Sequence, residues 1–339
     1  MDRQGIITQL TEPHPFGDAI NLAHPRLGAE VVFATDEFYG DKRRLIAPDP
    51  PVFLPDKYDA NGKWMDGWES RRRRTPGHDW CDIRLGMPGK ISATEIVTRH
   101  FTGNFPPEAA IEACRHNGVV PDDQTEWVSI VAKRSVKGNR QHFSTVDSDE
   151  SWTHVRLHIF PDGGVARLRV WGRVDRDFSK IASNEEIDLF AIENGGRAMF
   201  CNDEHFGTMH NLNAPGRGIN MGDGWETARR REPGNDWVVM ALGAPGILTR
   251  VVVDTAHFKG NYPDEVELRA LNIPETAHPF NPLDSEKWPV LLPRQKLGPD
   301  DVHEFRDALQ IHDRVSHVRM NIFPDGGVSR LRLFGTVAT

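Results

Sequence analysis

Two runs of arginine are the densest groups of chemically active side chains in the 339-residue chain. The first run covers Arg71–Arg74 and the second covers Arg229–Arg231. A planar guanidinium group binds a carboxylate through two parallel hydrogen bonds, so both runs predict contact with an anionic ligand. The alternative is a solvated charge run, or ion pairs with the neighbouring Glu69 and Glu226. The candidate contacts are the arginines that correspond between the runs: Arg72, Arg73, Arg74, Arg229, Arg230 and Arg231.

Carboxylates and histidines occur in the same paired fashion and have the chemistry for proton transfer. The candidate catalytic residues are Glu37, Glu204, His100 and His257. The candidates for binding the polar groups of a ligand are Asp66, Glu69, Asp223 and Glu226. Each type also has a structural alternative. An aspartate before glycine often forms an Asx turn, a glutamate often forms a surface ion pair, and a histidine often hydrogen-bonds at a strand end.

All of these residues occur twice because the chain contains an internal duplication. Residues 65–91 and 222–248 are identical at 15 of 27 positions, and residues 154–174 and 317–337 at 15 of 21. Between them, His-Phe-Thr-Gly-Asn-Phe-Pro begins at His100 and His-Phe-Lys-Gly-Asn-Tyr-Pro begins at His257. The three pairs follow the same order. Copies of this length are folded domains rather than the short units of a solenoid.

Short strands separated by glycine and proline must position these residues. Residues 155–160 and 165–170 alternate in polarity around Pro-Asp-Gly-Gly, and residues 318–323 and 328–334 repeat the pattern, so each pair predicts a β-hairpin. Helical pattern is scarce, with one or two turns expected at 107–115 and at 300–309. The sequence therefore predicts an all-β protein with two β-sandwiches of the jelly-roll type in tandem. Further strands are expected at 30–35, 80–85, 93–100, 127–132, 237–242 and 248–254.

The duplication also sets the expected domain boundaries. Residues 1–18 precede the first copy and predict an N-terminal arm. The first repeat is expected at 19–174 and the second at 187–339. Between them, residues 175–186 are polar and predict a linker.

Composition excludes several classes of protein. A formal net charge of −8 argues against a nucleic-acid-binding protein. The longest apolar run, residues 237–253, is interrupted by Ala-Pro-Gly and carries Arg250, so no membrane span is expected. The first 20 residues lack the apolar core of a signal peptide, and three unpaired cysteines are typical of a reducing compartment. A cytoplasmic location is the expectation.

Several motifs resemble those of the allantoicase family. In the first copy they are Asn-Leu-Ala from Asn21, Ala-Thr-Asp-Glu-Phe from Ala34 and Asp-Gly-Trp-Glu through the arginines to His-Asp-Trp at 78–80. In the second copy they are Asn-Asp-Glu-His-Phe from Asn202 and Gly-Asp-Gly-Trp-Glu from Gly222. The resemblance runs from about residue 20 to the end of the chain. It implies two repeats similar to galactose-binding and discoidin-like domains, a homo-oligomer, and the conversion of allantoate and water to ureidoglycolate and urea.

Under that resemblance the paired residues acquire expected roles. Arginine would hold the carboxylate of allantoate, and a general acid and base would serve the leaving urea and the incoming water. The chain has neither an HExxH nor an HxH motif, so no metal or other cofactor is predicted, and a divalent metal stays an open alternative. One site per repeat, one shared site and one working repeat all fit the sequence. Two other functions also fit: a non-catalytic ligand-binding module, and a hydrolase of another ureido or guanidino acid.

Overall fold

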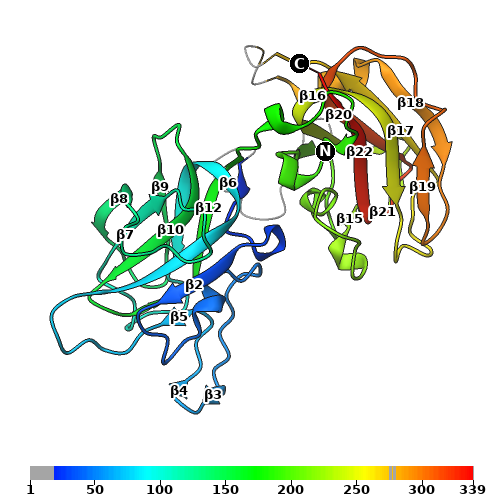
Figure 1. Cartoon of the computed structure of the whole chain (residues 1–339). Coiled ribbons are helices and arrows are strands. Elements are labelled where there is room, and N and C mark those ends of the chain that lie inside the picture. The colour runs from blue at the N-terminus through cyan, green and yellow to red at the C-terminus, as the bar shows by residue number, and fades with distance from the viewer. Residues whose placement is uncertain (1–18, 275–276, 278–279, 339) are drawn as a thin grey trace. The chain divides into compact units, whose positions relative to one another are not determined.

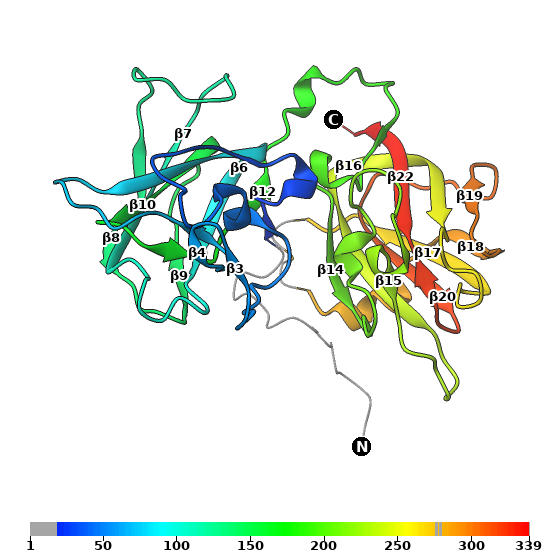
Figure 2. The same cartoon turned by 90° about the horizontal axis from the view of Figure 1, so that it is seen from below.

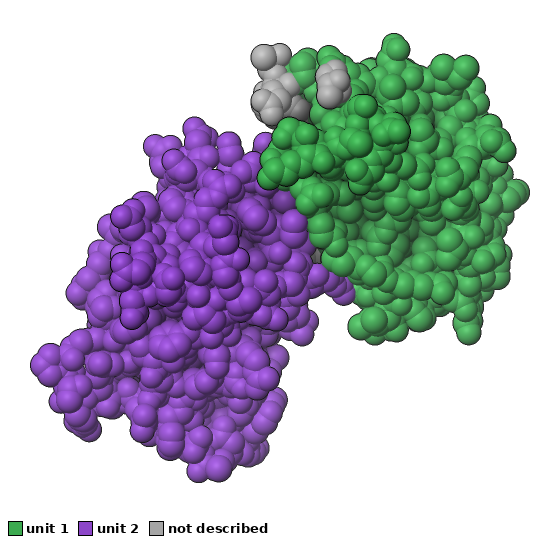
Figure 3. Space-filling model, in the orientation of Figure 1, with its two compact units in different colours: residues 1–18, 176–339 green, residues 19–175 purple. Residues whose placement is uncertain are grey.

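The computed structural model describes residues 19–274, 277 and 280–338, and in them the chain is all-β with short 3-10 helices. The predicted arm at 1–18 lies outside the described residues. The chain divides between Asp175 and Arg176 into two compact units, shown in different colours in Figure 3. We call the residues 19–175 the first repeat and the residues from 176 onward the second repeat. The described 3-10 helices are η1 (Pro25–Leu27), η2 (Lys42–Ile46), η3 (Phe178–Lys180), η4 (Ile192–Asn194), η5 (Met209–Asn211), η6 (Met221–Asp223) and η8 (Pro282–Lys287).

One long strand, β6 (Asp79–Val97), joins both sheets of the first repeat (Figure 1). Its first half pairs with β2 and β10, and its second half with β9 and β12, all antiparallel. The two sheets therefore run β2–β6–β10–β7–β8 and β1–β12–β6–β9. The other strands are β1 (Ile20–Asn21), β2 (Glu30–Ala34), β7 (Glu108–Cys114), β8 (Val128–Ser135), β9 (Gln141–Thr145), β10 (Ser151–Phe160) and β12 (Arg167–Val174).

The second repeat has the same topology around β16 (Asp236–Asp254). Its sheets run β14–β16–β20–β17–β18 and β13–β22–β16–β19, and Figure 2 shows β17, β18 and β20 side by side. The remaining strands are β13 (Ile187–Asp188), β14 (Arg197–Cys201), β17 (Glu265–Leu271), β18 (Val290–Lys296), β19 (Val302–Phe305), β20 (Val315–Phe323) and β22 (Arg330–Val337). The predicted pair of all-β sandwiches is confirmed.

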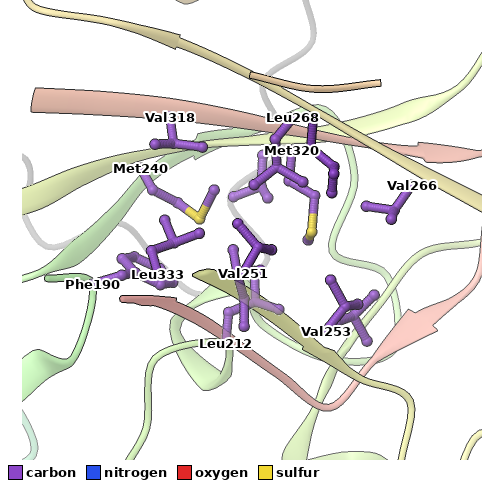
Figure 4. Packing of buried hydrophobic residues seen from close by; sticks show 14 of the residues in the cluster. Phe190, Leu212, Met240, Val251, Val253, Val266, Leu268, Val318, Met320 and Leu333 are labelled. Carbon is purple, nitrogen blue, oxygen red and sulfur yellow. The ribbon is translucent and has the colours of Figure 1, made fainter. Parts of the chain in front are cut away.

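Alternating side chains build a separate core within each sandwich. In the second repeat, Val318 and Met320 point from β20 toward Leu333 of β22 in the opposite sheet (Figure 4). All three are fully buried, and removing a side chain of this size from water contributes about 1.5–3 kcal/mol. Each sandwich thus has the apolar interior that holds its surface loops in place.

Short two-stranded ribbons lie at one end of the sandwiches and carry several of the predicted site residues. In the first repeat β5 (Trp68–Glu69) pairs with β11 (Gly164–Val165), and in the second β15 (Trp225–Glu226) pairs with β21 (Gly327–Val328). The first repeat adds a hairpin of β3 (Tyr58–Asp59) and β4 (Gly62–Lys63), which projects at the bottom of its unit in Figure 1. The corresponding stretch of the second repeat holds η5 and η6 instead.

Two expectations about local structure were wrong. The strands on either side of Pro-Asp-Gly-Gly do not pair as a hairpin; β10 pairs with β6 and β7, whereas β12 pairs with the other half of β6. The turn itself has the positive φ that glycine permits, 140° at Gly163 and 136° at Gly326, but it carries the chain from one sheet to the other. The helical turns expected at 107–115 and 300–309 are instead the strands β7 and β19.

Three cysteines lie buried without disulfide partners. None of the helices in the described part of the chain has the length and apolar character that crossing a membrane requires.

Candidate active site

Two of the predicted site residues, Glu69 and His100, line the same cavity in the first repeat. Its volume is about 500 Å³, within the range of about 300–1,000 Å³ that is usual for small-molecule sites. The walls come from the loop before η2, the β3–β4 hairpin, β5 and the loop after β6. The lining residues are Tyr39, Phe53, Asn61, Gly62, Lys63, Met65, Glu69, His100, Thr102, Asn104 and Asn139.

Glu69 is held by its backbone on both sides. It bridges to Gly40 and pairs with Gly164 of β11. Both neighbours must be glycine, because a Cβ at Gly164 would lie 2.0 Å from the ring of Phe101 and a Cβ at Gly40 would lie 2.4 Å from the carbonyl oxygen of Gly67. The fold therefore fixes where the Glu69 side chain starts.

The Glu69 carboxyl group is suited to carrying a proton. The side chain is 9% exposed, and the Asn104 amide donates to its Oε1 at 2.7 Å. Burial raises the pKa of Glu69 above the ordinary 4.5, and the Asn104 hydrogen bond opposes that rise. Glu69 thus keeps its proton to a higher pH than an exposed glutamate does, and Asn104 leaves its Oε2 for the proton.

His100 presents one basic nitrogen. Its Nε2 lies 3.0 Å from the carbonyl oxygen of Pro51, and since a carbonyl oxygen only accepts, Nε2 carries the hydrogen. With Nε2 as the donor, the nitrogen of this ring that can accept a proton is Nδ1. The backbone of His100 has φ of 72°, an uncommon conformation for a residue other than glycine, and its N–H donates to Asn139 Oδ1 at 3.1 Å. Phe53 stacks on the ring at a centroid distance of 5.8 Å.

The structure gives Asp66 and Asp223 structural contacts. Asp66 accepts a hydrogen bond from Arg167 at 2.8 Å, and Asp223 accepts one from Arg330 at the same distance. Both arginines are almost fully buried and also donate to backbone carbonyls. Asp66 further accepts the N–H of Val52 at 3.0 Å. These two aspartates tie the loops to the sandwich.

Glu37 and Glu204 hold the starts of two 3-10 helices. Glu37 accepts the backbone N–H of Lys42 at 3.0 Å and binds the Lys42 ammonium at 2.7 Å. Glu204 accepts the backbone N–H of Met209 and the hydroxyl of Thr208, each at 3.0 Å. Neither carboxylate is among the residues that line the cavity described above.

The six candidate arginines also lie outside the lining of that cavity. Arg73 pairs with the buried Asp79 at 2.6 Å, and Arg230 pairs with the buried Asp236 at 2.6 Å. Arg72 lies 3.7 Å from Asp162. The remaining three, Arg74, Arg229 and Arg231, are exposed.

The second repeat reproduces the arrangement of the glutamate, the amide and the histidine. Asn261 donates to Glu226 Oε1 at 2.5 Å. His257 has φ of 72°, and its Nε2 donates to the carbonyl oxygen of Gly218 at 2.8 Å. Its backbone N–H donates to Asp300 Oδ1 at 2.7 Å, as that of His100 does to Asn139.

A chain of two histidines and one carboxylate crosses one sheet face of the first repeat. His78 Nε2 lies 2.8 Å from His158 Nδ1, and His158 Nε2 lies 2.8 Å from Glu112. Burial, with the neighbouring His158, lowers the pKa of His78. In the second repeat the same hydrogen bonds are made by Asn235, Asn321 and Glu267. In the second repeat, amide side chains thus make these hydrogen bonds in place of imidazole rings.

No group of three or more histidine, cysteine, aspartate or glutamate side chains in the described residues is placed to hold a metal ion.

Comparison with known proteins identifies the family. The family model for the allantoicase repeat matches the chain twice, at residues 20–175 and 187–338. The chain belongs to the allantoicase family. A probable allantoicase of Photobacterium profundum is 52% identical over 320 residues, which cover 94% of this chain and 97% of that protein. A probable allantoicase 2 of Burkholderia pseudomallei is 51% identical over 319 residues, covering 94% and 95%.

A solved allantoicase has the same fold. The crystal structure of allantoicase from Saccharomyces cerevisiae matches with a TM-score of 0.80 at 36% identity, over 94% of this chain and 93% of that one. The tandem sandwich predicted from the repeated motifs is therefore the architecture of the allantoicase family.

Of the residues that line the cavity in this allantoicase-family protein, the sequence pointed only to Glu69 and His100, and the polar residues that it missed include Lys63 and Asn104. Asn104 lies inside the repeated His-Phe-Thr-Gly-Asn-Phe-Pro motif, so its duplication was an available signal. Lys63 lies in a stretch that the second repeat does not match, and a search for duplicated residues passes over it.

Proposed function

We propose that this protein hydrolyses allantoate to ureidoglycolate and urea in the degradation of purines. The proposal is carried by the family match, which spans both repeats and reaches relatives about half identical over nearly their whole length. A cavity lined by a buried glutamate and a histidine supports it, because the reaction needs an acid for the leaving urea and a base for the water.

The proposed roles follow from the position of both side chains at the cavity and from the raised pKa of Glu69. Allantoate has one carbon that bears a carboxylate and two ureido groups. Protonated Glu69 gives its proton to the ureido nitrogen that leaves, as the bond from that nitrogen to the central carbon breaks. His100 Nδ1 takes a proton from water as the oxygen of the water bonds to the same carbon. The products are urea and ureidoglycolate, and transfer of the proton from His100 back to Glu69 completes the cycle.

Urea release from allantoate by the purified protein tests the function. We expect one urea and one ureidoglycolate for each allantoate consumed, both with and without prior treatment with EDTA. Loss of activity after EDTA and its return with manganese would require a metal in the mechanism. Absence of urea from the folded protein, with manganese supplied, would exclude the proposed function and favour a ligand-binding module.

Two further expectations remain proposals: a cytoplasmic location and a homo-oligomer. Light scattering coupled to size-exclusion chromatography measures the mass of the assembly directly, and a monomer would contradict the second.

A further inference from the structure

The two repeats differ most in the segment that walls the cavity. Twenty-five residues separate Gly40 from Asp66, but only 15 separate Gly207 from Asp223. The end points correspond, since Gly40 bridges to Glu69 and Gly207 bridges to Glu226. The longer segment contains the β3–β4 hairpin and supplies Phe53, Asn61 and Lys63 to the cavity. The longer segment of the first repeat therefore forms a cavity wall that the shorter segment of the second repeat forms without the β3–β4 hairpin.

Lys63 is the one lysine or arginine among the residues that line this cavity. Its Nζ donates to the carbonyl oxygen of Leu54 at 3.0 Å and to that of Pro55. An ammonium group has three hydrogens, so one remains for a ligand. The ammonium also lies 5.2 Å from the ring centre of Phe53 and 4.7 Å from that of Tyr58. These contacts fix the charge in a half-buried position at the cavity wall.

The second repeat places its cations elsewhere. Its shorter segment has one arginine, Arg217, which pairs with Asp254 at 3.2 Å. Lys259 is highly exposed and lies 3.8 Å from Asp300. The sulfur of Met221 lies 3.9 Å from Asn261 Nδ2, beside the amide that holds Glu226. Glu226 is also less buried than Glu69.

We propose that the chain has one working site, in the first repeat, and that Lys63 binds the carboxylate of the substrate there. The inference rests on the proposed function, because it assigns a role within that reaction. The substrate class is a ureido acid, held by its carboxylate at Lys63 and by the ureido nitrogen that leaves at Glu69. The second repeat keeps the glutamate, amide and histidine as parts of its loop structure.

Binding of hydantoate tests the role of Lys63 without turnover. Hydantoate has one ureido group and a carboxylate, and N-carbamoylglycinamide replaces that carboxylate with a neutral amide. Loss of a charged hydrogen bond typically weakens binding about 10- to 100-fold. We expect Lys63→Gln to weaken hydantoate binding by that factor and to leave binding of the amide unchanged, whereas Lys63→Arg restores most of the affinity. Lys259→Gln is the matched control and should bind hydantoate as the wild type does.

The outcomes separate loss of charge from loss of fold. Equal weakening for hydantoate and the amide in the Lys63→Gln variant would indicate a damaged cavity and overturn the role of Lys63. Unchanged hydantoate binding in Lys63→Gln would overturn it as well.

The number of sites is tested by calorimetry and by a pair of glutamate variants. We expect one hydantoate per chain, at least a 100-fold loss of urea release in Glu69→Gln, and near wild-type release in Glu226→Gln. Two hydantoates per chain, or equal losses in the two variants, would overturn the single site. If the wild type binds one hydantoate but releases no urea from allantoate, the proposed function fails while the assignment of the binding site stands.

Discussion

At the scale of single residues, the protonation of Glu69 sets the expected pH dependence of catalysis. Burial raises the pKa of this carboxyl group, and only the protonated form delivers a proton to the leaving nitrogen. We therefore expect kcat to fall as pH rises through the raised pKa of Glu69. Steady-state kinetics of urea release across pH would measure this limb. The Glu69→Gln variant should have no such limb in its residual activity, and a limb that persisted there would assign the proton to another group.

The same pKa shift makes a second prediction, for stability. Between the ordinary pKa of 4.5 and the raised pKa, the folded protein holds the Glu69 proton while the unfolded chain releases it. The free energy of unfolding should therefore fall as pH rises through this window, and the contribution of Glu69 is fully present only below it. The Glu69→Gln variant should not show the part of this decrease in the free energy of unfolding that Glu69 causes. Urea denaturation of both proteins at several pH values measures the difference, and parallel curves would contradict the shift.

The buried ion pairs of Asp66 and Asp223 predict that these aspartates contribute to stability. Arg167 and Asp66 form a 2.8 Å ion pair with side chains only 2% and 13% exposed. Breaking such a pair by removing one partner costs about 3–5 kcal/mol, because the other charge stays buried. We expect Arg167→Met to lower the free energy of unfolding by about 3 kcal/mol, and Arg330→Met to do the same through Asp223. Chemical denaturation checks both, and a loss under about 1 kcal/mol in either variant would contradict a structural role.

At the scale of elements, the 25-residue segment between Gly40 and Asp66 should be separable from the sandwich. Replacing residues 41–65 with residues 208–222 keeps the bridge to Glu69 but removes the β3–β4 hairpin and Lys63. We expect this chimera to fold and to lose at least 100-fold in kcat/KM. Circular dichroism and urea release are the measurements. The reverse transplant, residues 41–65 in place of 208–222, is the control and should keep the wild-type activity.

Sequence pattern predicted the strands but not their partners. The alternation at 155–160 and 165–170 gave both strands correctly, yet the two belong to opposite sheets, because alternation reports a buried face and not a neighbour. One or two helical turns were expected at 107–115. The alanines and glutamates there favour helices, but the pairing of β7 with β8 on one side and β10 on the other outweighs that preference.

The cavity was harder to predict than the sheets. Glu69 and His100, which line the cavity, were among the sequence candidates because both are duplicated. Lys63 is held by carbonyl oxygens of its own loop, and no duplicated pattern marks it. The sequence marked the neighbourhood of Lys63 only by a difference in length: the segment between Gly40 and Asp66 is ten residues longer than its counterpart in the second repeat. The φ of 72° at His100 left no trace in the sequence either, because that conformation is imposed by the loop hydrogen bond to Asn139.

At the scale of the whole molecule, duplication gives two similar sandwiches whose loops have diverged. The two sandwiches have the same strand order, and in each of them one long strand, β6 or β16, takes part in both sheets. The loops keep the Glu–Asn hydrogen bond in both copies and differ in length beside it. Under the proposed single site, both cores must stay stable, whereas only the loops of the first repeat must keep the groups that bind the substrate.

Hydrogen exchange of the full chain tests whether only the first repeat binds the ligand. A ligand that binds only the folded state stabilises it by about 2.7 kcal/mol at 100 times its dissociation constant. With saturating hydantoate we expect slower amide exchange in peptides of the first repeat, most of all at residues 51–69 and 98–104, and no change at 208–226 or 255–261. Lys63→Gln with hydantoate at the same concentration is the control. A 10- to 100-fold weaker Kd leaves only about 0.4–1.4 kcal/mol of the stabilisation, so the protection should be clearly smaller than in the wild type. Protection of the matching peptides in both repeats would show that the second loop cluster still binds ureido acids, and the divergence of the loops would then have altered affinity without removing a site.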